Sequence, residues 1–207
     1  KAYRHDAGPL TVDDVLSSPT ISSPLHALDC CLVVDGGGAV VLTSLERARD
    51  LRDDPVAVLG AGSATDHFSG GAMANLTSTE ARRSAAAAFG EAGVTPADID
   101  VTEVYDSFTI TVLLTLEALG YCGPGEAKDL IADGAIRPGG SLPLKTNGGG
   151  LSYCHPGMYG ILLFVEAVRQ LRGEAGDRQV AGAELAVAHG TGGVFSSHGT
   201  LVLGVDR

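Results

Sequence analysis

Two apolar helical segments limit the fold of this chain more than any other feature of its sequence. They span residues 108–120 (FTITVLLTLEALG) and 158–173 (MYGILLFVEAVRQLRG), and both are apolar on most sides. A helix of this kind has to be buried. Runs rich in β-branched residues at 56–64 and 99–106, and a hairpin-like pair at 184–205, predict strands that the helices can cover. The sequence therefore predicts an α/β fold, and its 29 glycines suit the tight turns of such a fold.

The first quarter of the chain has a different composition. Residues 30–44 (CCLVVDGGGAVVLTS) hold two β-branched runs around a glycine-rich bend and predict a buried pair of strands. The charged segment that follows predicts a short helix that ends at Pro55, where the composition changes. We place a domain boundary there, between residues 1–54 and 55–207. The chain begins without methionine, and we expect it to be part of a longer or split protein.

Two helix starts are predicted from capping residues. Thr77 and Glu80 have the capping-box spacing ahead of an alanine-rich helix. Asp106 or Ser107 can cap the apolar helix that begins near Phe108. These caps predict where the two helices begin.

Charge and cysteine content argue against several classes of function. The formal net charge of −11 repels a phosphate backbone, so nucleic acid is a poor candidate partner. No apolar run approaches the roughly 20 residues that a membrane span requires, and the first residues lack the apolar core of a secretion signal. The four cysteines have neither zinc-site nor disulfide spacing. We expect a soluble, cytoplasmic protein that binds no metal and no membrane.

The first candidate site follows a predicted strand and precedes a buried helix. It consists of Glu103, Tyr105, Asp106 and Ser107. Ligands of open α/β sheets collect at the carboxyl ends of strands, where helix N-termini present free amides. This placement favours a site that uses Tyr105, Asp106 and Ser107. In the alternative, Asp106 only caps the helix and Tyr105 packs with its hydroxyl satisfied.

The second candidate site is the glycine-rich segment 147–160 (NGGGLSYCHPGMYG). Its consecutive glycines let the backbone approach a bulky ligand closely. His155 lies just before a helix N-terminus, where the helix dipole favours a developing oxyanion and lowers the pKa of an imidazole. In the alternative, the glycines only make a tight turn and His155 bonds to the backbone. The candidate residues here are Asn147, Gly148, Gly149, Gly150, Tyr153, Cys154, His155 and Tyr159.

The third candidate site is the turn of the predicted hairpin, HGTGG at residues 189–193. Its glycines either line a ligand or only turn the chain, and the turn is the simpler explanation. His189 and Gly192 are the candidate ligand contacts in this turn. His26 and His67 have no partners at a meaningful spacing, and we expect them to be structural or surface residues.

Taken in order, these segments resemble the second half of thiolases, over essentially the whole chain. The most specific part is the Gly-Gly-Gly-x-x-x-x-His-Pro-Gly element at residues 148–157. The chain is most similar to the sterol carrier protein x type and the bacterial lipid-transfer-protein branch. The resemblance implies a thiolase-like βαβαβαββ half with a five-stranded mixed sheet layered with helices. Residues from 55 onward would form the C-terminal half, and earlier residues the last strands of the N-terminal half.

The chain departs from thiolases at their reactive positions. Thiolases carry a nucleophilic Cys in the N-terminal half and a second Cys in a C-x-G element, where AVAHGTGG stands here at 186–193 without one. Tyr105-Asp106-Ser107 replaces the Asn-His or His-Asp pair, and Cys154 replaces the Gly of the Gly-His-Pro motif. Phenols, with an ordinary pKa near 10, can act as acid or base where a site lowers that pKa. This pattern resembles bacterial steroid side-chain-cleaving aldolases.

The resemblance implies retro-aldol cleavage of a β-hydroxy acyl-CoA on a steroid side chain, giving a 17-ketosteroid and propionyl-CoA. Tyr105, with Tyr153 or Tyr159, would transfer the protons, and His155 with nearby amides would hold the thioester enolate. It implies no cofactor beyond the CoA of the substrate, a homodimer, and an OB-fold domain of an acyl-CoA hydratase as partner. Two alternatives stay open: a thiolytic acyltransferase with its cysteines elsewhere, and a non-catalytic scaffold that binds acyl-CoA or sterol.

Overall fold

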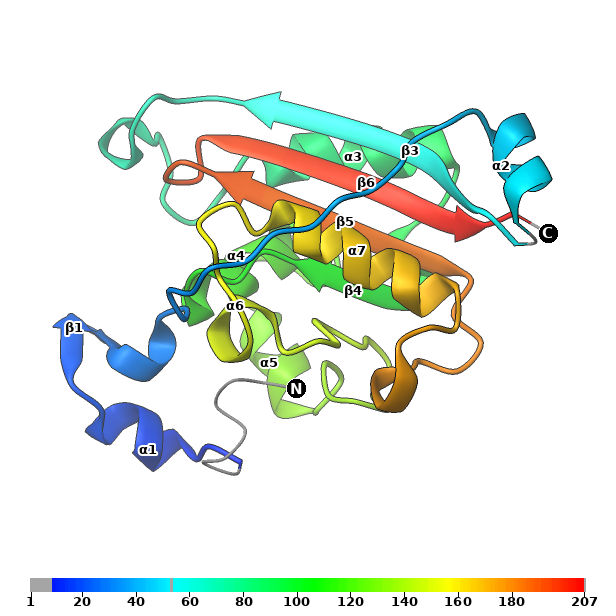
Figure 1. Cartoon of the computed structure of the whole chain (residues 1–207). Coiled ribbons are helices and arrows are strands. Elements are labelled where there is room, and N and C mark those ends of the chain that lie inside the picture. The colour runs from blue at the N-terminus through cyan, green and yellow to red at the C-terminus, as the bar shows by residue number, and fades with distance from the viewer. Residues whose placement is uncertain (1–8, 53, 207) are drawn as a thin grey trace.

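The computed structural model describes residues 9–52 and 54–206 (Figure 1). Its helices are α1 (Val12–Ser17), α2 (Leu45–Leu51), α3 (Ala81–Ala92), α4 (Thr109–Leu119), α5 (Ala127–Ala132), α6 (Gly149–Ser152) and α7 (Gly160–Leu171). Its strands are β1 (Thr20–Ser22), β2 (Leu25–His26), β3 (Val56–Thr65), β4 (Val101–Val104), β5 (Leu185–Gly192) and β6 (Ser197–Val205). The predicted α/β fold is confirmed, as are both apolar helices and the C-terminal hairpin.

The main sheet is mixed and has the strand order β3-β6-β5-β4. Strands β4 and β5 run parallel, and the other two pairings are antiparallel. The fifth strand of the expected sheet is reduced to one parallel bridge between Leu144 and Thr102. There Thr102 N donates to Pro143 O and Lys145 N donates to Thr102 O, each at 3.0 Å. Pro143 has no N–H to donate, which keeps this pairing short.

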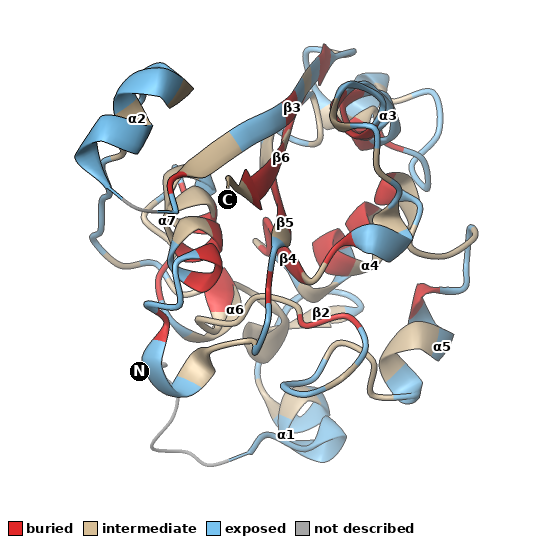
Figure 2. Ribbon diagram, turned by 90° about the vertical axis from the view of Figure 1, so that its right-hand side faces the viewer, coloured by how far each residue is buried: buried red, intermediate tan, exposed pale blue. Residues whose placement is uncertain are grey.

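Helices cover both faces of the main sheet (Figure 2). Helices α3 and α4 lie on one face and α7 lies on the other. Side chains alternate between the two faces along each strand: Val187 and Val202 pack with α3 and α4 against Leu116, and Ala186 and Leu203 pack with α7. Because each apolar helix has a sheet face to cover, both helices are buried as predicted.

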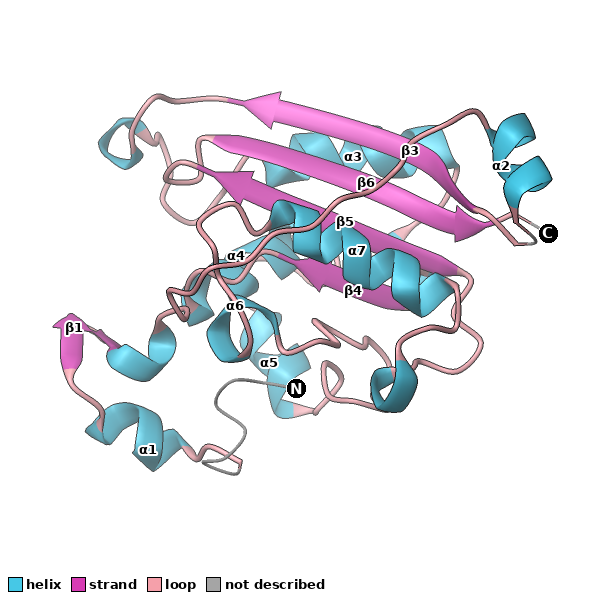
Figure 3. Cartoon of the chain, viewed as in Figure 1, coloured by secondary structure: helices cyan, strands magenta, loops and turns pink. Residues whose placement is uncertain are grey.

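The predicted buried strand pair at residues 30–44 is wrong. Apart from single bridges at Cys30 and Val33, the segment is extended chain without strand pairing (Figure 3). Val33 and Val41 are 91% and 93% exposed. The segment runs along α7, where a Cβ on Gly38 would meet Ile161 and neighbouring side chains (Figure 1). No other strand of the described residues lies beside it, and β-branched residues form a strand only when one does.

The predicted caps of both helices, Thr77 for one and Asp106 or Ser107 for the other, are also wrong. Helix α3 begins at Ala81 with Glu80 as its N-cap, and Thr77 instead bonds to Asn75. Helix α4 has Phe108 as its N-cap without a side-chain bond, because the Asp106 carboxylate is engaged elsewhere. The helix does end as expected at Gly120, which has a φ of 88°.

The division into residues 1–54 and 55–207 stays a prediction. Every strand of the main sheet falls within residues 56–205, while residues 1–8 and 53 of the proposed first unit lie outside the described part of the chain. Among the described residues, every helix is too short or too polar to cross a bilayer.

Candidate active site

A cavity of about 1140 Å³ lies at the carboxyl ends of β4 and β5. All three candidate sites line it, through Tyr105 and Ser107, residues 155–161, and residues 190–199 of the hairpin except Ser196. Glycines 36–38 of the extended N-terminal segment complete its wall. This edge is where an α/β sheet is expected to bind a ligand. The size of the cavity suits a large, largely apolar ligand.

Three aromatic rings form the centre of the cavity wall. The Tyr105 ring meets the rings of His155 and Tyr159 edge-on, with centroids 5.2 and 5.8 Å away, and His155 stacks on Tyr159 at 6.0 Å. The Tyr105 hydroxyl donates a long bond of 3.3 Å to Gly157 O. The buried Nε2 of His155 has no hydrogen-bond partner among the described residues. A phenol and an unengaged imidazole nitrogen therefore come together beside one cavity.

Burial determines the protonation of these three groups. It raises the pKa of Tyr105, to which the nearby Cys31 adds, and it raises the pKa of Tyr159 above its ordinary range. Burial also lowers the pKa of His155. At neutral pH both tyrosines are consequently neutral phenols that can donate a hydrogen bond, and His155 is a neutral imidazole that can accept one.

The glycine-rich segment 147–150 supports the cavity wall from behind. Asn147 Oδ1 accepts from Gly149 N at 2.8 Å and from the Tyr159 hydroxyl at 3.2 Å. The buried Asp106 carboxylate accepts from Gly150 N and Leu151 N at 2.7 and 3.0 Å. Neither Asn147 nor Asp106 lines the cavity, nor do Gly148, Gly149 and Gly150. The geometry gives these residues the position of supports for His155 and Tyr159.

Sequence reasoning missed Lys145, the buried cation beneath this segment. The Lys145 ammonium forms an ion pair with Asp106 and lies 5.2 Å from the centre of the Tyr159 ring. Glu103 accepts two hydrogen bonds from Thr146 through one carboxylate oxygen, and burial raises its pKa to about 7. Burial lowers the pKa of Lys145, and Asp106 opposes that shift. A lysine inside a Gly/Pro-rich loop gave no sequence signal, because its burial depends on the fold.

His189 of the hairpin was predicted to contact a ligand, but the histidine of the hairpin that lines the cavity is His198. His189 is fully buried, and its Nδ1 lies 2.8 Å from Thr200 Oγ1. Its burial, followed by the effect of His198, lowers its pKa to about 3. His198 and Gly192 line the cavity, and His198 Nδ1 lies 3.5 Å from His189 Nε2. Residues on one strand alternate between faces, so His189 points away from the cavity that Gly190 lines.

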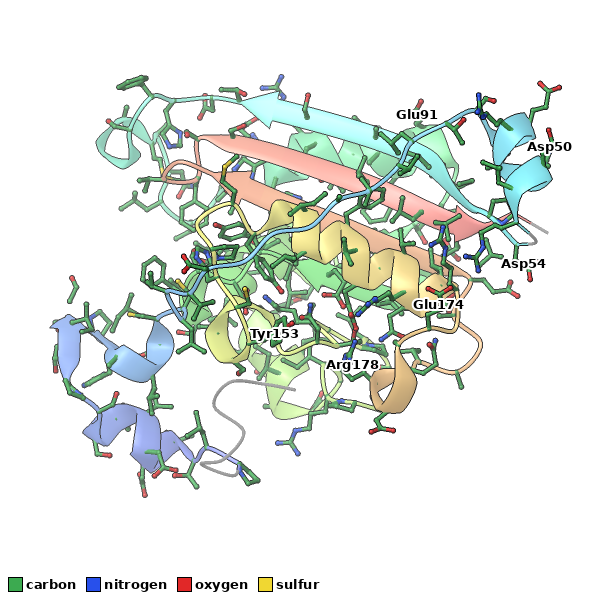
Figure 4. All side chains as sticks on the ribbon, viewed as in Figure 1. Asp50, Asp54, Glu91, Tyr153, Glu174 and Arg178 are labelled. Atoms are coloured by element: carbon green, nitrogen blue, oxygen red, sulfur yellow. The ribbon has the colours of Figure 1, made fainter. Side chains whose placement is uncertain are left out.

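Tyr153 and Cys154 do not line the cavity. The Tyr153 side chain is 41% exposed and lies below α7, on the same side as Arg178 (Figure 4). Cys154 is buried, and its thiol makes a weak contact of 3.9 Å with Asp35 O. Of the two candidates for a second catalytic tyrosine, only Tyr159 is at the cavity. Among the described residues, no group of three His, Cys, Asp or Glu side chains is placed to hold a metal ion.

The sequence and the fold of this chain match those of known proteins. Residues 62–205 match the family described as thiolase C-terminal domain-like. The chain is 44% identical to a 17-hydroxy-3-oxo-4-pregnene-20-carboxyl-CoA lyase of Mycobacterium tuberculosis, over 93% of this chain and 50% of that protein. It is 40% identical to an acetyl-CoA acetyltransferase of Methanothermobacter thermautotrophicus, over 91% and 51%. A solved structure described as an Ltp2-ChsH2(DUF35) aldolase aligns with a TM-score of 0.88 and 37% identity, over 97% and 53%. The chain thus spans about half the length of these relatives.

Proposed function

Because this chain belongs to the thiolase C-terminal domain-like family, we propose that it supplies the C-terminal half of a retro-aldolase that cleaves a β-hydroxy acyl-CoA on a steroid side chain. The products would be a 17-ketosteroid and propionyl-CoA. The observation that carries this proposal is the meeting of the Tyr105 phenol and the unengaged His155 imidazole at a large cavity. A lyase and an aldolase among the relatives support the same reaction class.

The reaction requires two proton transfers around one bond cleavage. A base removes the proton of the β-hydroxyl, and the electrons of that O–H bond form the carbonyl of the ketone. The electron pair of the broken carbon–carbon bond moves onto the thioester as an enolate. An acid then protonates the α-carbon and completes propionyl-CoA. Stabilisation of the enolate oxygen by preorganised hydrogen-bond donors is usually the largest single contribution that a protein makes to such a step.

The protonation states in the cavity favour a division of roles that differs from the sequence hypothesis. A tyrosine could be the base only as a phenolate, but the pKa values of Tyr105 and Tyr159 are raised. In our proposal His155 Nε2 accepts the hydroxyl proton and returns it to the α-carbon, and the Tyr105 phenol donates to the enolate oxygen. The proton that enters the imidazole is the proton that leaves it, so no external acid is consumed.

We place the protein in the cytoplasm, where its four cysteines, which form no disulfide among the described residues, would remain thiols. We propose no cofactor beyond the CoA of the substrate, a homodimer, and an OB-fold domain of an acyl-CoA hydratase as partner. The exposed valines Val33 and Val41 offer apolar surface that such an assembly would cover.

Tyr105→Phe tests the proposal in the complete protein with its partner. Loss of this hydrogen-bond donor should lower the rate of steroid side-chain cleavage by about 10²- to 10³-fold, with the ketone and propionyl-CoA followed by mass spectrometry. The matched control is Tyr121→Phe, because the Tyr121 hydroxyl bonds to Thr102 at 2.6 Å and lies off the cavity. Full activity in Tyr105→Phe, in a protein that folds normally, would refute the role of this phenol.

Acyl transfer is the second candidate function. Cys31 lines the cavity beside Tyr105, and one relative is named as an acetyltransferase. A thiol nucleophile would form an acyl-enzyme, which a retro-aldolase does not need. Intact-mass analysis after incubation with a β-keto acyl-CoA should show no acyl adduct in our proposal. An adduct that disappears in Cys31→Ser would establish the transferase instead.

A further inference from the structure

The sheet floor of the cavity carries a row of residues almost without side chains. Ser63 on β3 pairs with Gly199 on β6, and Gly199 pairs with Gly190 on β5. All three residues line the cavity. Residues directly opposite each other on neighbouring strands project from the same face. We call these three residues the sheet strip. It continues toward the end of β4, where Tyr105 N donates to His189 O at 3.0 Å.

The backbone does not require glycine at either position of the strip. Neither Gly190 nor Gly199 has a positive φ. A Cβ on Gly199 would find no atom within 4 Å, and one on Gly190 would first meet Gly160 Cα at 3.8 Å, an ordinary contact. Gly60 and Gly62 on β3 differ, because a Cβ there would collide with the backbone of α3.

Glycine inside a strand weakens the strand and often marks a place where another group approaches the backbone closely. For Gly60 and Gly62 that group is helix α3. Gly199 faces only the open cavity, and Gly190 faces the cavity with Gly160 Cα at an ordinary contact distance. A ligand that lies against the sheet would account for both glycines.

The other walls of the cavity differ from its floor. Tyr105, Ser107 and His155 line it near the end of β4 and supply polar side chains. Ile161, Met158 and Phe195 add apolar side chains to the wall. The cavity thus offers polar partners for a reacting end and apolar surface for the rest.

We propose that the sheet strip determines specificity for a flat, rigid, polycyclic acyl group, which lies on the bare backbone with its reacting end at Tyr105. This inference rests on the retro-aldolase function proposed above and names the surface that selects its substrate. A rigid ring system can contact the whole row without losing conformational freedom on binding. Gly199 and Gly190 keep the floor open, and a side chain at either position lifts the ring system away from it.

Gly199→Val in the complete protein with its partner tests the inference with two substrates. One is the steroid β-hydroxy acyl-CoA, and the other is 3-hydroxy-2,3-dimethylbutanoyl-CoA, which would give acetone and propionyl-CoA. We expect kcat/KM for the steroid substrate to fall about 10- to 200-fold, the usual range for a misfit of one small group. The small substrate should be cleaved as by wild type. Gly190→Ala should show the same selectivity with a smaller loss.

Gly71→Val is the matched control, because Gly71 is exposed, has open space around its Cβ position and lies off the cavity. It should leave both substrates unaffected. Equal loss for both substrates in Gly199→Val, or no loss for either, would overturn the sheet strip as a specificity surface. If wild type cleaves neither substrate, the retro-aldolase proposal fails. In that case, calorimetry measures the binding of steroid acyl-CoA and of butanoyl-CoA to wild type and to Gly199→Val. If Gly199→Val weakens the binding of both equally, the sheet strip is refuted as a specificity surface.

Discussion

The N-terminal region (residues 9–52) and the sheet region (residues 54–206) contrast in how their apolar residues are used. Within the described residues, the N-terminal region has no buried residue, although it contains β-branched runs and two short helices. The sheet region contains both apolar cores, most of the cavity wall and the buried ion pair of Lys145. The difference shows that apolar sequence becomes core only where a neighbouring element covers it.

The largest difference in stability between the two regions is expected when a charged side chain is removed from each. Lys145→Met removes the cation beside Asp106 and Glu103, and we expect the free energy of unfolding to fall by about 3–5 kcal/mol. Arg49→Met, in α2 of the N-terminal region, breaks a solvent-exposed pair with Asp206 and should leave stability unchanged. Urea denaturation measures both. Equal losses would show that the two regions are not energetically distinct.

Truncation of one leucine in each region should give a smaller difference in stability, again with the larger loss in the sheet region. Leu116 in α4 is fully buried, and Leu116→Ala should lower the free energy of unfolding by about 2–5 kcal/mol. Leu42 is 73% exposed, and Leu42→Ala should change it by less than about 0.5 kcal/mol. Thermal unfolding of the two variants beside wild type tests the pair. A large loss in Leu42→Ala would mean that another surface covers the N-terminal region.

The smallest expected effect is on the pH dependence of cleavage, which should depend on His155 of the sheet region and not on His26 of the N-terminal region. Burial lowers the pKa of His155, so the neutral imidazole persists to a pH below its ordinary value near 6.5. The cleavage kcat/KM should be level above that lowered pKa and fall about tenfold per pH unit below it. His26→Asn, in the N-terminal region, should leave this profile unchanged. An acidic limb centred above pH 6.5 would contradict His155 as the neutral base.

The sequence correctly predicted several elements for which the local signal and the packing agree. Helices α4 and α7 are apolar enough that only burial suits them, and Gly120 ends α4 in the left-handed conformation. Predictions failed where the local signal competed with tertiary contacts. Asp106 has a side chain suited to capping α4, yet two amides of segment 149–152 and Lys145 take its carboxylate. Residues 30–44 have strand propensity without a neighbouring strand.

By itself the sequence determined the fold class, the family resemblance and the segments that could carry chemistry, because helix burial, strand alternation and glycine-rich turns are local properties. Only the tertiary structure decided which candidates meet at one cavity. It brings Tyr105, His155 and Tyr159 together, leaves Tyr153 near the surface, and turns His189 inward while Gly190 faces the ligand space. Burial, pKa shifts and the bare row of Gly190 and Gly199 depend on residues that are distant in the chain. No local pattern therefore encodes them.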